Sequence, residues 1–139
     1  VGRTLTALPG GSALLRRAAG ADTAQSAAIF MLHRVLPDPS ACYDPEMVVS
    51  LPVFEAFLAW AARVYEIVPL GELPQRLARA APGAGRPLGV LTFDDGWSDT
   101  YTHAFPVLQR LRLTATVFLP LAFIGSQRRF CASSPKLRM

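Results

Sequence analysis

The sequence predicts an α/β fold in which parallel strands alternate with helices. Two observations predict it: short apolar segments rich in β-forming residues, and intervening segments whose apolar residues recur every three or four positions. Repeated alternation of this kind is typical of a mainly parallel sheet or of an α/β barrel. Only four strands are visible in the sequence, whereas a closed barrel needs about eight. We therefore expect either a small open sheet or an incomplete barrel.

The helix expected from Ser50 to about Tyr65 has the clearest pattern. Ser50 is the expected N-cap, and Pro52 suits the first turn because proline is tolerated there. The apolar residues at helical spacing are Phe54, Phe57, Leu58, Ala61 and Val64. We expect this stripe to pack in the core. The other predicted elements are strands at Ala27–Leu32, Glu66–Leu70, Leu88–Phe93 and Thr114–Leu119, helices at Leu70–Ala80 and Phe105–Leu111, and a loop at Pro37–Met47.

Two adjacent carboxylates, Asp94 and Asp95, end the strand predicted at Leu88–Phe93. Such a pair is costly to bury and its charges repel, so it usually needs a cation or a shared proton. Gly96 allows a sharp turn beside the pair. Ligands of parallel sheets bind at the carboxyl ends of the strands, which is where this pair lies. We therefore expect Asp94 and Asp95 to belong to a functional site.

His33 follows the first predicted strand directly, with Arg34 after it. If the strands are parallel, His33 shares an edge of the sheet with Asp94 and Asp95. A histidine beside a strand can also be a purely structural hydrogen-bonding residue. Both interpretations of His33 stay open on these residues alone.

The positive net charge of the chain is confined to its carboxyl-terminal part. Residues 1–100 contain 8 basic and 10 acidic side chains, and residues 101–139 contain 6 basic and no acidic ones. This distribution favours a solvated basic tail over a nucleic-acid-binding face. At 51% hydrophobic and 17% charged, the 139 residues are typical of one globular domain. We predict a weakly ordered leader at residues 1–24, a domain at 25–125 and an irregular basic tail at 126–139.

No segment of the sequence reads as a membrane span or a signal peptide. The longest apolar run, Val117–Ile124, is interrupted by Pro120 and is too short to cross a bilayer. The amino end lacks a charged segment followed by an apolar run of signal-peptide length. These patterns leave the localisation open between the cytoplasm and the periphery of the cell envelope.

Several of these segments resemble the polysaccharide deacetylases, whose domain is also called the NodB homology domain or carbohydrate esterase family 4. The resemblance rests on Leu91–Gly96 (LTFDDG), Pro106–Leu108 (PVL) and Thr114–Leu119 (TATVFL). Met31–Val35 (MLHRV) looks like the first-strand segment of the branch that acts on poly-N-acetylglucosamine-type chains. The motifs stand in the family's order and extend over roughly Ala27–Gly125.

The resemblance implies the amino-terminal part of a distorted (β/α) barrel that removes N-acetyl groups from amino-sugar polymers. It implies Asp94 as the catalytic base, Asp95 as a metal ligand and His33 as a residue lining the substrate pocket. The implied cofactor is a divalent metal, Zn²⁺ first, with Co²⁺ or Ni²⁺ as alternatives, and the implied partner is an N-acetylated polysaccharide. A metal ion lowers the pKa of its bound water, and a carboxylate not bound to the metal can take the water's proton.

The sequence lacks the later motifs of this family. The family supplies two more ligands from a His-x-x-x-His-type motif, and the one further histidine here, His103, has no partner at ligand spacing. After Gly125 the sequence has neither strand nor helix periodicity. We expect a truncated or frameshifted product that is inactive as written, with the exposed edge of the Thr114–Leu119 strand open to association.

Three other interpretations of the acidic pair remain. The chain could be a non-catalytic remnant that binds carbohydrate or a partner protein. A Mg²⁺ site for phosphoryl transfer ranks last, because the loop Pro82–Pro87 (PGAGRP) does not match a phosphate-binding motif. Asp94 and Asp95 could also be a turn and helix-capping pair with no chemistry.

Overall fold

The computed structural model describes residues 26–42, 45–81 and 85–126. The predicted leader at 1–24 and all of the predicted basic tail except Ser126 lie outside the described residues. Within the described part, parallel strands alternate with helices in an incomplete α/β fold, as predicted. None of its helices combines the length and apolar character that crossing a bilayer requires.

Strand β5 (Leu88–Phe93) is the centre of the main sheet, and all of its pairings are parallel. Strand β1 (Ala27–Leu32) pairs with it along its whole length. On the opposite edge, β4 (Glu66–Ile67) pairs with the start of β5 and β6 (Thr116–Val117) pairs with its end. All six residues of β5 are buried, which agrees with the continuous apolar run expected of a central parallel strand.

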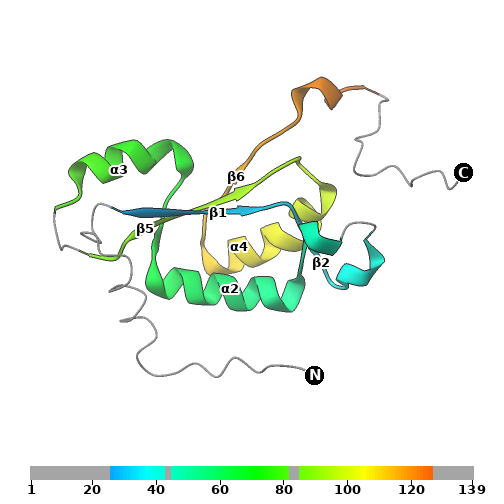
Figure 1. The fold of residues 1–139 in the computed structure, drawn as a ribbon, viewed down its shortest axis with the longest axis horizontal. Coiled ribbons are helices and arrows are strands. Elements are labelled where there is room, and N and C mark those ends of the chain that lie inside the picture. The colour runs from blue at the N-terminus through cyan, green and yellow to red at the C-terminus, as the bar shows by residue number, and fades with distance from the viewer. Residues whose placement is uncertain (1–25, 43–44, 82–84, 127–139) are drawn as a thin grey trace, which may run out of the picture.

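Three helices cover the two faces of this sheet. Figure 1 shows α2 (Leu51–Val64) and α4 (Phe105–Leu111) on one face and α3 (Leu73–Arg79) on the other. A π-helical turn, Thr100–Ala104, leads into α4. Single 3₁₀ turns occur at Pro39–Ala41, Pro45–Met47, Leu70–Glu72 and Leu121–Phe123.

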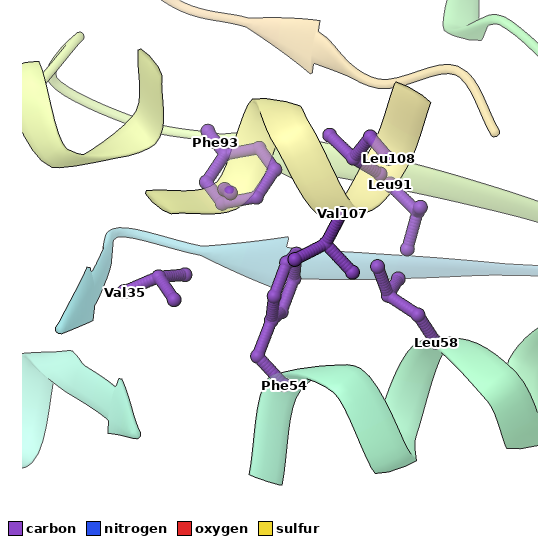
Figure 2. Close-up of a cluster of buried hydrophobic side chains, with 8 residues drawn as sticks. Val35, Phe54, Leu58, Leu91, Phe93, Val107 and Leu108 are labelled. Atoms are coloured by element: carbon purple, nitrogen blue, oxygen red, sulfur yellow. The ribbon is translucent and has the colours of Figure 1, made fainter. Parts of the chain in front are cut away.

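The main core lies between β5 and the pair of helices α2 and α4. Leu91 and Phe93 point from β5 toward Phe54 and Leu58 of α2, and Val107 joins them from α4 (Figure 2). Phe54 is fully buried and its ring meets that of Phe93 edge to face at 6.0 Å. Phe57, which was expected in the core, and Leu111 of α4 are partly buried and pack against this cluster. The opposite face of β5 has a smaller core of Val68, Leu73, Leu88 and Val90.

Three details differ from the predicted elements. The strands predicted at Glu66–Leu70 and Thr114–Leu119 are shorter in the structure, because β4 and β6 each pair only with one end of β5. A second, two-stranded parallel sheet joins β2 (Arg34–Leu36) to β3 (Val48–Ser50), on either side of the predicted loop. Ser50 holds the N-cap position of α2, but its side chain makes no capping hydrogen bond.

Candidate functional site

The ends of β1 and β5 bring two of the predicted site residues together. In the parallel register Leu32 lies opposite Phe93, and the Asp94 amide donates to the Leu32 carbonyl at 2.9 Å. His33 and Asp94 therefore leave the sheet side by side. Their Nε2 and Oδ2 atoms are 3.9 Å apart, and about a quarter of each side chain is exposed. This pair is reachable from solvent while its backbone is held by the sheet.

Directly after Asp94, the chain makes a tight turn at Asp95 and Gly96. Asp95 and Gly96 both have left-handed backbones, with φ of 70° and 61°. This conformation costs a residue other than glycine about 1 kcal/mol, and aspartate is among the residues that adopt it most readily. Asp94 and Asp95 line one open cavity of about 470 Å³ together with Phe118, Leu119 and Pro120. The roles predicted for Asp94, Asp95 and His33 stay predictions.

The structure adds two charged residues that the sequence did not single out, Arg34 and Asp99. The Asp99 side chain is 5% exposed; its Oδ2 accepts from Nε of Arg34 at 2.8 Å and forms an ion pair with Nη2 at 2.8 Å. Its Oδ1 accepts from the backbone amide of Val35 at 3.1 Å. Asp99 thus ties the segment after the acidic turn to the segment after His33. The one sequence signal for this pair was that Arg34 stands at a strand end beside a candidate residue.

Trp97 connects this ion pair to the acidic turn. The guanidinium carbon of Arg34 lies 4.4 Å from the centre of the Trp97 ring, within cation–π range. The indole Nε1 of Trp97 donates to Oδ2 of Asp95 at 3.3 Å. Arg34 also donates through Nη1 to the Cys42 sulfur at 3.2 Å.

The described residues do not form a complete metal site. Within residues 26–42, 45–81 and 85–126, no three His, Cys, Asp or Glu side chains are grouped so that they could hold an ion. A catalytic zinc is typically held by three protein side chains. The donor set around Asp95 therefore does not fit such an ion by itself.

An apolar groove of about 460 Å³ lies beside the acidic turn. Its lining comes from the turn, from the π-helical segment with α4, and from the segment around β6, and includes Trp97, Tyr101, Phe105 and Leu119. Thr100 also lines it, and the buried Thr100 hydroxyl has no hydrogen-bond partner among the described residues. Tyr101 and Phe105 stack with their rings 5.7 Å apart and nearly parallel.

Part of this chain is similar in sequence to a known protein family. The polysaccharide deacetylase family profile matches residues 83–131, a range that contains the acidic turn. In sequence and fold, the chain is therefore similar to part of a polysaccharide deacetylase domain. No match was found among curated protein sequences.

Two solved structures that are at least 25% identical in sequence have a similar fold. Streptococcus pyogenes deacetylase PplD, solved in complex with acetate, is 25% identical with a TM-score of 0.56, over 74% of this chain and 47% of PplD. IcaB from Ammonifex degensii is 29% identical with a TM-score of 0.55, over 68% of this chain and 38% of IcaB.

A third similar structure, a de-N-acetylase from Aggregatibacter actinomycetemcomitans, supports the fold alone at 21% identity. Its TM-score is 0.53, over 66% of this chain and 36% of that one. The chain thus spans less than half the length of each of the three proteins.

Proposed function

We propose that the chain carries part of a site for removing N-acetyl groups from amino-sugar polymers, of the poly-N-acetylglucosamine type. The observation that carries the proposal is the placement of His33 and Asp94 at paired strand ends, with Asp95 in the next turn. The family match over residues 83–131 supports it. PplD was solved with acetate, which is the acid that N-deacetylation releases.

Asp94 is the proposed base of this site. Hydrolysis of an N-acetyl group forms a bond from the water oxygen to the acetyl carbon and breaks the carbon–nitrogen bond. The proton leaves the water for a base, and the departing nitrogen takes up a proton. The Asp94 carboxylate is 29% exposed and stands in an open cavity, so a water and an acetyl group can reach it. His33 is proposed to line the same pocket.

We further propose that a divalent cation, Zn²⁺ or alternatively Co²⁺ or Ni²⁺, belongs to the complete site, and that Asp95 supplies one ligand. The sequence contains two histidines, His33 and His103, and no His-x-x-x-His-type pair. A single carboxylate holds such an ion weakly, because tight sites typically use three protein ligands. The 139-residue chain is therefore expected not to be a competent deacetylase.

Two measurements test these proposals separately. The site proposal is tested by NMR titration of the chain with N-acetylglucosamine oligomers, and we expect the shifted signals to include His33, Asp94 and Asp95. Shifts confined to other surfaces, or no shifts at millimolar oligomer, would reject the site.

Competence is tested by adding Zn²⁺, Co²⁺ or Ni²⁺ and measuring released acetate and bound metal. We expect no acetate above background and less than one metal per chain. Metal-dependent turnover that disappears in Asp94→Asn would show that the chain is competent after all.

A second candidate function is association with a protein through the edge of β6. Val117, Phe118 and Leu119 are 43%, 48% and 52% exposed, and they lie beside the apolar groove. Exposed apolar strand edges invite pairing with another chain. Analytical ultracentrifugation would support this function if the chain self-associates and Val117→Lys makes it monomeric. A chain that stays monomeric and binds the oligomers would favour the sugar site.

A further inference from the structure

The carboxylate of Asp95 is linked to a buried ion pair through one tryptophan. The links run from Asp99 to Arg34, from Arg34 to the Trp97 ring, and from the Trp97 indole to Asp95. The ion pair spans 2.8 Å, the guanidinium carbon lies 4.4 Å from the centre of the indole ring, and the indole hydrogen bond is 3.3 Å long. The three contacts are continuous, because Arg34 and Trp97 each take part in two of them.

The buried end of this series of contacts, Asp99, is held by hydrogen bonds to both of its carboxylate oxygens. Both carboxylate oxygens of Asp99 accept hydrogen bonds, one from the Arg34 side chain and one from the Val35 amide. Burying a carboxylate without partners is costly, so the paired geometry is strongly preferred over alternatives. The Arg34 side chain is itself 22% exposed, and its guanidinium is planar. The Arg34 plane is therefore fixed against the indole.

The other end of this series of contacts is Asp95, a residue of the candidate site. Asp95 has a left-handed backbone, which by itself leaves its side chain free to adopt several rotamers. The indole N–H donates to Oδ2 of Asp95, and this hydrogen bond favours one orientation of the carboxylate. Because the indole is held by Arg34, the orientation of Asp95 depends on a residue that does not touch it.

We propose that Arg34, Trp97 and Asp99 are positioning residues that orient the Asp95 carboxylate. The inference rests on the proposed function, in which Asp95 belongs to the site. In a purely structural role, the Arg34–Asp99 pair would only hold two segments together. Changing Arg34 would then leave the Trp97–Asp95 hydrogen bond unaltered. The NMR signals of the Trp97 indole and of the Asp95 side chain distinguish the two roles.

The experiment uses NMR of the 139-residue chain, in which Trp60 and Trp97 are the two tryptophans. Arg34→Lys keeps the charge but loses the flat stack and the forked donor. We expect the Trp97 indole proton to shift and to exchange with solvent about tenfold faster, as for loss of a charge-assisted hydrogen bond. The Asp95 side-chain carboxyl carbon should shift as well. The Trp60 indole is the internal reference, and its signal should stay unchanged.

Two further variants keep the proposal falsifiable if Arg34→Lys does not fold. Trp97→Phe keeps an aromatic ring under Arg34 and removes the indole donor, so the Asp95 carboxyl carbon should shift while the urea midpoint stays close to that of the parent chain. Arg110→Lys is the matched control, because Arg110 pairs with Glu55 at 2.8 Å on the exposed surface. It should leave both signals in place.

An unchanged Asp95 carbon in folded Trp97→Phe, or an unchanged Trp97 indole in folded Arg34→Lys, would overturn the positioning role. Neither reading requires sugar binding or acetate release. Failure of the positioning proposal is therefore distinguishable from failure of the proposed function.

Discussion

Replacing Phe54 with alanine is expected to destabilise the fold by about 3–5 kcal/mol. The Phe54 ring is fully buried between α2 and β5 and meets Phe93 edge to face. Loss of its transfer free energy contributes about 1.5–3 kcal/mol, and the remaining cavity and the lost aromatic contact add to it. Phe57, one turn along α2, is only partly buried and packs at the border of the same cluster. Phe57→Ala is therefore expected to cost roughly half as much.

Urea unfolding followed by circular dichroism measures both costs, with unchanged slope as the sign that the same surface is exposed in each variant. If Phe54→Ala is unfolded before urea is added, Phe54→Leu replaces it, with an expected cost of roughly 1–3 kcal/mol. The reasoning is refuted if Phe57→Ala costs as much as Phe54→Ala, or if Phe54→Leu costs nothing. Either result would mean that α2 presents a different face to β5.

Three other substitutions test the strand packing, the acidic turn and a surface turn. Gly89→Ala should lower the free energy of unfolding by about 1–3 kcal/mol, because the added Cβ would lie 2.9 Å from Cβ of Tyr65. Gly71→Ala is the control: Gly71 has open space around it, so this variant should be nearly neutral in the same unfolding assay. Gly96→Ala should destabilise more than Gly85→Ala: both have positive φ, but only the Gly96 Cβ would also clash with Leu119. Hydrogen bonds from Ser40 to Asp38 hold the pKa of that carboxyl below its ordinary value, so Ser40→Ala should raise the pKa in an NMR titration. The stability from this contact is present above the unfolded pKa of Asp38 and is lost as the pH falls through its lowered folded pKa.

The sequence predicted those parts of the fold whose pattern lies within a single helix or strand. The burial of Phe54 and Leu58 follows from helical spacing within α2, and the burial of β5 from six consecutive β-forming or small residues. The meeting of His33 with Asp94 needed one further assumption, that β1 and β5 are parallel and aligned at their ends. The alternation of strands and helices supplied that assumption, and the register agrees with it.

The parts that were missed depend on residues far apart in the sequence. β2 and β3 are three residues each and acquire strand geometry only by pairing with one another. β6 is short because only the last two residues of β5 pair with it, and no pattern within the β6 segment encodes that pairing. Asp99 looks like an ordinary polar residue near a helix start, and it is buried because Arg34, 65 residues earlier, lies opposite it. Propensity within a segment carries no information about such partners.

The packing of the sheet and the geometry of the candidate site depend on the same register. Along β1, Phe30 and Leu32 face the main core while Ile29 and Met31 are more than half exposed, so the side chains alternate between the two faces. A shift of β1 by one residue along β5 would turn Phe30 and Leu32 away from the core, which burial strongly opposes. The same shift would place His33 opposite a residue other than Asp94 and would pull Arg34 out of line with Asp99. Apolar packing in the middle of the sheet therefore fixes which polar groups meet at its edge, without any attraction among those polar groups being needed to set the register.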